Sequence, residues 1–275
     1  MENSIKLTHG DWYAEILPHF GMNAVTLRHF GRDILRYPRN IEELRSSPYL
    51  FGTPLLFPAN RTKGGRFFFD GNEFGLPLNE PTRNNHIHGL LYDAPFEVMS
   101  RSENEVTARF INNGERYPFP FEIVIRDLLD ERGYERAVTV TNTGDSAMPF
   151  TLAFHTTFVE PRWFSAPIGK RFEVDENYIP TGNMLSTVRE YRDGCDPSSR
   201  KISGFFERDG KCATVGGYVY EFSEEFDNVI LFNALGEMGI LCIEPQAGEV
   251  NGLNSKRCKI LKPNESAIFT HRIGI

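Results

Sequence analysis

Four short segments of this chain place residues that can move protons or donate hydrogen bonds inside otherwise apolar sequence. The first is Pro-Ala-Asn-Arg at residues 58–61, where a guanidinium follows directly after an apolar run. A planar guanidinium can hold hydroxyl oxygens or a carboxylate with several donors at once. Arg61 can also be a surface cation at the end of a strand, so this segment does not decide a function by itself.

The second segment is Asn-Asn-His-Ile-His-Gly at residues 84–89. If these residues form a strand, His86 and His88 share one face and Ile87 points to the other. Two imidazoles on one face indicate either a metal site or hydrogen bonding and proton transfer in a pocket. Each of the two can also be a structural histidine.

The third and fourth segments supply an imidazole and a carboxylate. His155 lies in Leu-Ala-Phe-His-Thr-Thr-Phe at residues 152–158, where a core histidine bonded to a carbonyl is a common alternative. Glu244 ends the apolar run 240–243 and precedes a proline. Burial there would raise the carboxyl pKa toward the range of a general base, whereas a Glu244 that faces solvent would do no chemistry. The joint occurrence of all four segments is what points to a site.

The elements that must position these residues are mostly strands. Short runs that alternate apolar and polar residues recur along the chain, with glycine-containing turns between them. The clearest runs are residues 5–7, 13–17, 24–27, 67–69, 96–98, 106–110, 121–125, 137–140, 229–232 and 267–270. One short helix is expected at residues 40–45. Strands joined by turns predict an all-β protein, a large antiparallel β-sandwich with residues 1–275 as a single domain.

Charge and composition argue against several kinds of partner. A formal charge of -7 and a pI near 5.6 disfavour nucleic acid, which needs clustered lysines and arginines. No apolar run approaches the ~20 residues that span a bilayer, and the polar start lacks a secretory pattern, so we expect no membrane association and a cytoplasmic location. The four cysteines are scattered, without metal-binding spacing or the pattern of a disulfide framework.

Taken in order along the chain, these segments resemble the aldose 1-epimerases, the galactose mutarotase-like family. The matching segments are Pro-Ala-Asn-Arg at 58–61, His-Ile-His-Gly at 86–89, His155 shortly before an aromatic residue, and Glu-Pro-Gln at 244–246. Flanking stretches at residues 17–21, 31–35, 117–121 and 178–182 also look like family segments. The similarity covers nearly the whole chain.

The resemblance implies a galactose mutarotase-type sandwich that binds a small sugar, such as galactose or glucose, in a cleft and interconverts its two anomers. By motif match, Glu244 would be the general base, His155 the general acid and His88 the second active-site histidine. The substrate-binding residues implied by the same match are Arg61, Asn60, His86 and Gln246. No metal or other cofactor is expected, because two proton-transfer groups worth ~10²–10⁴-fold each suffice for a reaction that already proceeds in water. A monomer or a homodimer is expected.

Two alternatives keep the same fold. A hexose-6-phosphate 1-epimerase would need extra cations around the cleft, for which Arg61, Lys63 and Arg83 are available. A non-catalytic sugar-binding or sensing protein would keep the cleft without turnover. It is motivated by residues 202–207, which hold no aspartate near the place where many family members have one that contacts sugar hydroxyls.

The least expected alternative is a cupin-type metal enzyme. In that interpretation His86, His88 and Asp93 would bind iron, manganese or zinc inside a β-barrel. The sequence carries no second cupin segment at a suitable spacing.

Overall fold

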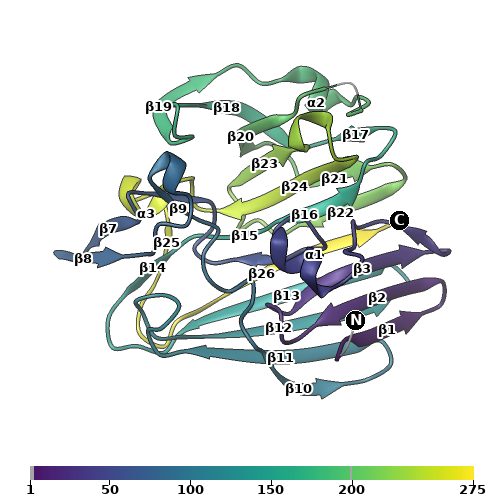
Figure 1. The fold of residues 1–275 in the computed structure, drawn as a ribbon, viewed down its shortest axis with the longest axis horizontal. Coiled ribbons are helices and arrows are strands. Elements are labelled where there is room, and N and C mark those ends of the chain that lie inside the picture. Colours follow the sequence, from purple (N-terminus) through teal and green to yellow (C-terminus); the bar gives the residue numbers. More distant parts are fainter. Residues whose placement is uncertain (1–2, 199) are drawn as a thin grey trace.

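The computed structural model describes residues 3–198 and 200–275, and antiparallel β-strands make up most of its regular structure. Every pairing between the strands of these residues is antiparallel. Two eight-stranded sheets dominate the molecule (Figure 1). Each run predicted from the sequence lies in a strand, apart from Phe96, which precedes its strand by one residue. The predicted antiparallel all-β architecture is confirmed.

The first large sheet contains the most regular hairpin of the fold. Its order is β10 (Glu97–Arg101), β11 (Glu105–Asn112), β12 (Phe121–Asp130), β13 (Gly133–Asn142), β26 (Ser266–Gly274), β22 (Tyr218–Phe222), β21 (Cys212–Val215) and β17 (Phe164–Ser165). Alternate residues of β12 and β13 are buried, so one face of the hairpin packs on the core. The turn between them requires Gly133, because a Cβ there would lie 2.2 Å from the carbonyl oxygen of Ile273.

The second large sheet carries the strand that matters most for function. Its order is β19 (Pro180–Leu185), β18 (Ile168–Val174), β20 (Ser203–Arg208), β23 (Asn228–Phe232), β24 (Ile240–Ala247), β15 (Leu152–Phe154) and β5 (Leu55–Leu56), and β16 (Thr156–Val159) also pairs with β24. All eight residues of β24 are buried, because other parts of the chain cover both of its faces. A polar side chain on β24 is therefore held in a dry environment.

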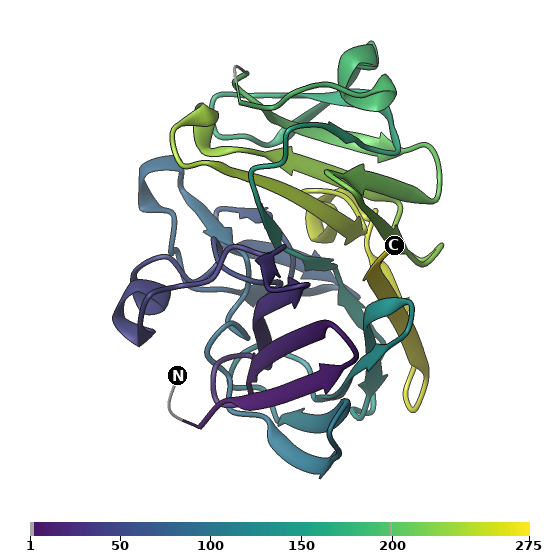
Figure 2. The same ribbon diagram turned by 90° about the vertical axis from the view of Figure 1, so that its right-hand side faces the viewer.

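Smaller sheets and short helices complete the fold. The small strands are β1 (Ile5–His9), β2 (Trp12–Leu17), β3 (Asn23–His29), β4 (Arg32–Asp33), β6 (Arg61–Lys63), β7 (Arg66–Phe69), β8 (Asn72–Gly75), β9 (Asn85–Ile87), β14 (Met148–Phe150) and β25 (Lys259–Leu261). The helices are α1 (Ile41–Ser46), η1 (Pro81–Arg83), α2 (Arg189–Asp193), η2 (Ala234–Gly236) and α3 (Gly252–Ser255). Strands β1 and β2 pack against the sheet of β11, β12 and β13 (Figure 2).

Helix α1 confirms the helix predicted at residues 40–45. Its N-terminus is capped by Asn40, whose Oδ1 accepts the backbone N–H of Glu43 at 2.9 Å. Across residues 3–198 and 200–275, none of the helices combines the length and the apolar character that crossing a membrane would require.

One ion pair lies fully inside the core. Arg136 donates two hydrogen bonds to Asp127, at 2.7 and 2.9 Å, and both side chains are shielded from solvent. The same guanidinium donates to the backbone carbonyl of Thr53 at 2.8 Å. The Thr53 hydroxyl in turn contacts the Thr156 hydroxyl at 2.9 Å, and Thr156 contacts that of Tyr220 at 2.7 Å. The Arg136–Asp127 pair is thus connected, through Thr53, to Thr156 at the start of β16.

Candidate active site

A cavity of about 400 Å³ lies where the second large sheet meets the small β6–β9 sheet. Asn60, Arg61, Ile87 and His88 line one side, while residues of β20, β23 and η2 line the other. His155 and Glu244 line a buried part of it, with side-chain exposures of 5% and 3%. The volume falls in the range of pockets that hold small molecules.

His155 and Glu244 face each other at the bottom of this cavity. The distance between His155 Nε2 and Glu244 Oε1 is 3.3 Å. Two residues almost ninety positions apart are joined because β15 and β16 run beside β24. The structure therefore brings together the imidazole and the carboxylate that the sequence predicted as an acid–base pair.

The strand register explains why His155 meets Glu244. Ala153 pairs with Gln246 and Thr156 pairs with Ile243, so the same register sets His155 opposite Glu244 across the gap between β15 and β16. Residues directly opposite each other in an antiparallel pair project their side chains to the same face. The backbone N–H of His155 binds the carbonyl of Pro54, at 3.0 Å.

Burial governs the protonation of the pair. It raises the pKa of Glu244 to about 8, against a smaller lowering effect of the Arg61 cation. It lowers the pKa of His155 to about 4. Between these values the two groups together hold one proton, which belongs to the pair rather than to either residue. Such a pair can accept one proton and donate another, as acid–base catalysis requires.

His88 adds a second imidazole beside the first. Its ring centroid lies 5.2 Å from that of His155 and 4.6 Å from that of Tyr49. Burial, followed by the neighbouring charges of His155 and Arg61, lowers the pKa of His88 well below its usual value. His88 is therefore neutral near pH 7 and available as a hydrogen-bonding group in the cavity.

Backbone geometry places His88, and it differs from the predicted strand. His88 has a φ of 64° and lies just beyond β9, so the alternation of side chains ends at Ile87. Its N–H donates to the carbonyl of Asn60 at 2.9 Å. Gly89 must follow, because a Cβ at that position would lie 2.0 Å from the carbonyl oxygen of Phe57. The His-Gly pair is thus needed to turn the imidazole into the cavity.

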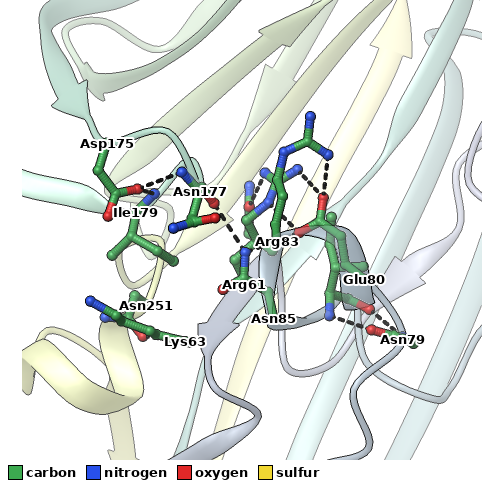
Figure 3. A network of polar contacts seen from close by, with 12 residues as sticks. Arg61, Lys63, Asn79, Glu80, Arg83, Asn85, Asp175, Asn177, Ile179 and Asn251 are labelled. Atoms are coloured by element: carbon green, nitrogen blue, oxygen red, sulfur yellow. Dashed lines mark hydrogen bonds and ion pairs between the residues drawn. The ribbon is translucent and has the colours of Figure 1, made fainter.

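Arg61 lines the cavity and is held by a carboxylate behind it. Its Nε and Nη2 donate to the two oxygens of Glu80 at 2.8 and 2.9 Å, a bidentate arrangement. Asn85 donates to Glu80 at 3.0 Å, and Arg83 does so at 3.2 Å. Figure 3 shows these side chains converging on Glu80. Glu80 therefore fixes the guanidinium and offsets part of its charge.

The rim of the cavity is built by a loop between β18 and β19. Asp175 Oδ1 accepts the N–H groups of Asn177 and Ile179, each at 2.9 Å (Figure 3). This turn presents Tyr178 to the cavity, with the guanidinium carbons of Arg61 and Arg83 at 4.9 and 4.8 Å from its ring centroid. Sequence reasoning assigned no role to Tyr178 or Glu80. Asp-Glu-Asn at 175–177, a turn-forming run, is the one local signal that precedes Tyr178.

The opposite wall is largely apolar. The side chains that line it include Phe205, Ile230, Phe232 and Leu235, together with Ser203. Aspartate is absent from the part of this lining that the structure describes. The wall can pack on carbon-bound hydrogens of a ligand, while polar recognition comes from the side of Arg61 and His88.

Two predicted substrate-binding residues do not line the cavity. His86 is fully buried, and its Nδ1 lies 2.7 Å from the carbonyl oxygen of Pro77. Gln246 is also fully buried and donates to the carbonyl of Gly248 at 2.9 Å. The prediction failed for His86 because the turn at His88 separates the two imidazoles. Both residues stabilise the walls instead. Asn60 and Arg61 do line the cavity.

The predicted cupin-type ligands do not assemble. Asp93 is partly exposed and bonds to Arg116, while His86 faces Pro77. Within residues 3–198 and 200–275, the potential metal-binding group consists of His155, Cys242 and Glu244, and none of the three belongs to the cupin-like set.

The fold and the site together define a class of protein: antiparallel sandwiches with a buried imidazole–carboxylate pair beside a small-molecule cavity. The model of the family described as aldose 1-epimerase matches residues 4–234. The chain therefore belongs to the aldose 1-epimerase family, as the resemblance implied.

Individual relatives are distant. The chain is 27% identical over 187 residues to uncharacterized protein YihR of Escherichia coli K12, covering 65% of this chain and 59% of YihR. It is 27% identical over 169 residues to maltose epimerase of Levilactobacillus brevis, covering 56% and 49%. The matches thus span about half the length of these curated relatives. The crystal structure of a galactose mutarotase-like protein from Clostridium acetobutylicum superposes with a TM-score of 0.91 at 26% identity, covering 98% of this chain and 94% of that one.

The raised pKa of Glu244 predicts that Glu244→Gln becomes increasingly stabilising, relative to the wild-type protein, as the pH rises. From about pH 4.5 to 8 the unfolded chain loses the Glu244 proton while the folded protein keeps it, so folding stability falls across this window. A glutamine side chain does not ionise, so the variant loses no folding stability in this pH window for that reason. The free energy of unfolding, measured with urea, should favour the variant by about 2–4 kcal/mol more at pH 8 than at pH 5.

The exposed carboxylate of Glu207 provides the control for this experiment. Glu207→Gln should change stability equally at both pH values. A Glu244→Gln gain that does not grow between pH 5 and pH 8 would contradict the desolvated carboxylate.

Proposed function

We propose that this protein is an aldose 1-epimerase that interconverts the α and β anomers of a free aldose by acid–base ring opening. The observation that carries the proposal is the 3.3 Å contact between His155 Nε2 and Glu244 Oε1 at the bottom of the cavity. The anomeric hydroxyl and the ring oxygen of a pyranose are bonded to the same carbon. Two groups this close can therefore reach both oxygens of one bound sugar.

In the proposed reaction, the pair reacts with its shared proton on His155 and with Glu244 ionised. Glu244 takes the proton of the anomeric hydroxyl while His155 donates the shared proton to the ring oxygen. The bond between C1 and the ring oxygen breaks, and C1 becomes the carbonyl carbon of an open-chain aldehyde. Rotation about the C1–C2 bond exposes the other face of the carbonyl. Ring closure with the two proton transfers reversed gives the other anomer and restores the pair.

The neighbouring residues support these roles. Arg61 favours the ionised form of Glu244, since its cation opposes the effect of burial on the Glu244 pKa. A guanidinium and a neutral His88 on the same side of the cavity provide hydrogen bonds for sugar oxygens. Proton transfer by positioned groups contributes typically ~10²–10⁴-fold each.

Removal of either proton-transfer group should abolish most of the activity. Glu244→Gln and His155→Asn are each expected to lower kcat/KM for anomer exchange by at least ~10²-fold. Saturation-transfer NMR on glucose and galactose measures the exchange directly. Glu207→Gln and His9→Asn change exposed residues of the same types and should retain the wild-type rate.

Wild-type protein that binds a sugar but leaves anomer exchange at the buffer rate would overturn catalysis and leave a sugar-binding protein of the same fold. Wild-type rates in the two variants, with unchanged thermal unfolding, would remove the role assignments.

The pH dependence of kcat/KM should be bell-shaped. Below a pH of about 4, His155 is protonated as well as Glu244, so the pair holds two protons and neither group can accept another. Above a pH of about 8, Glu244 loses the last proton, and no acid remains. Anomer exchange of a neutral aldose, corrected for the buffer rate, should therefore fall on both sides of this range. A constant rate from pH 4 to pH 9 would be incompatible with the pair.

A phosphorylated aldose is a second candidate substrate, favoured by Arg83. Arg61 is offset by its bidentate bond to Glu80, but Arg83 donates only through Nη1, at 3.2 Å, and is 38% exposed at the cavity. The remaining donors of Arg83 can bind an anion. Lys63 does not line the cavity, and Figure 3 shows it apart from the Glu80 cluster.

Arg83→Gln distinguishes the two substrates. If a phosphate is recognised, the ratio of kcat/KM for glucose 6-phosphate to that for glucose should fall by at least ~10-fold in this variant. Lys63→Gln removes a nearby charge outside the cavity and should leave the ratio unchanged. A ratio that Arg83→Gln does not lower would exclude this candidate and leave the free aldose.

A further inference from the structure

A thiol lies directly beneath the imidazole–carboxylate pair. Cys242 precedes Glu244 by two residues on β24, so both side chains project from the same face of the strand. Thr157, two residues after His155, pairs with Cys242 across the ladder. The ligand atoms of His155, Cys242 and Glu244 all lie within 4.8 Å of one another.

Among the described residues, the recorded polar contacts of this group are few. His155 Nε2 faces Glu244 Oε1, and the other ring nitrogen, Nδ1, is buried without a hydrogen bond to those residues. Cys242 is a free, buried thiol whose Sγ lies 3.5 Å from the Thr157 hydroxyl, as in a weak hydrogen bond to sulfur. Buried groups with so few hydrogen bonds have capacity for a ligand that protein side chains do not supply.

Imidazole, thiolate and carboxylate are the ligand types of zinc sites in proteins. We propose that His155, Cys242 and Glu244 form a binding site for a zinc-type divalent cation. Zinc bonds of roughly 2.0–2.3 Å place the atoms of a tetrahedral site about 3.3–3.8 Å apart. The 3.3 Å between His155 Nε2 and Glu244 Oε1 already meets this requirement, so Nε2 is the imidazole nitrogen that would bind the ion. Side-chain rotation that moves the thiol by roughly 1 Å completes it.

The charges of the bound state balance. Burial raises the pKa of the Cys242 thiol, and the His155–Glu244 pair holds one proton near pH 7, so the thiol and the pair are each neutral before the ion binds. Zn²⁺ binding releases one proton from each to solvent, and the thiolate and carboxylate then neutralise the ion. His155 binds as neutral imidazole, which its lowered pKa favours. The fourth position opens toward the cavity that His155 and Glu244 line.

Occupation of this site switches off the acid–base pair, because the cation takes the lone pairs that would receive protons. This consequence rests on the proposed function, whereas binding of the cation does not. The site therefore inhibits rather than assists anomer exchange, in contrast to a catalytic metal.

Direct binding of Zn²⁺ and Co²⁺ to the full chain tests the site without any sugar. Isothermal titration of the wild-type protein should show one zinc ion bound, with about two protons released per ion when buffers of different ionisation enthalpy are compared. Co²⁺ should give a near-ultraviolet thiolate-to-metal absorption band. Cys242→Ser should weaken zinc binding by at least ~100-fold and remove the band.

Cys212→Ser is the matched control, since it removes the exposed thiol on β21 and should change neither result. Cys242→Ala replaces the serine variant if the latter does not fold. Unchanged zinc affinity in the Cys242 variant, or a Co²⁺ complex without the thiolate band, overturns the proposal.

Catalysis provides a separate readout. Zinc should inhibit anomer exchange in the wild-type protein and in Cys212→Ser at concentrations that leave Cys242→Ser active. A wild-type protein that binds zinc through Cys242 but shows no anomer exchange on any aldose would contradict the proposed function and leave the metal site standing. Anomer exchange without zinc binding would contradict the metal site alone.

Discussion

The interaction on which the rest depends is the carboxyl group of Glu244 buried against the imidazole of His155, with no lysine or arginine of the described residues in direct contact with it. A carboxyl group in this position resists ionisation, because the protein interior solvates charge poorly. Arg61 is near enough to lower the pKa of Glu244 electrostatically, but its Nε and Nη2 donate hydrogen bonds to Glu80. Glu80 thus keeps Arg61 from forming an ion pair that would hold Glu244 as a permanent anion. The raised pKa of Glu244 depends on this restraint.

Maintaining such a pair requires a rigid support. The imidazole lies at a break between β15 and β16, where regular strand pairing cannot hold it. The chain on both sides is tied instead by side chains, since Arg136 binds the carbonyl of Thr53 and Thr53 contacts Thr156. An ion pair in the core and the proton-transfer pair in the cavity are therefore mechanically connected. Both pairs are buried. Arg136 and Asp127 are joined by two hydrogen bonds, whereas His155 and Glu244 are joined by one contact of 3.3 Å.

Strand positions could be predicted from sequence because they depend on local alternation and turn residues. The grouping of His155, Glu244, His88 and Arg61 around one cavity could be anticipated because each stands out chemically within an apolar segment. His86, predicted to bind substrate, lies outside the cavity because of one backbone dihedral angle. The φ of 64° at His88 turns one imidazole toward the cavity and leaves the other in the wall.

The residues that sequence reasoning missed have little local signal, apart from the turn-forming run 175–177 before Tyr178. Glu80 and Tyr178 gain their roles only through contacts with Arg61, which arise when distant segments meet. Cys242 shows no metal-binding spacing to the other cysteines in the sequence. Its proximity to the His155 imidazole depends on the pairing of β16 with β24.

The loop around Asp175 and the strand β24 are held by different contacts, and this has a consequence for how the cavity can be altered. The loop holds its shape mainly through its own turn, with Asp175 as the acceptor, and Asn85 donates to the carbonyl of Asn177 at 3.0 Å. The imidazole and the carboxylate are positioned instead by the pairing of β24 with β15 and β16. Exchanging a few rim residues would therefore reshape the mouth of the cavity while its buried end keeps its own support.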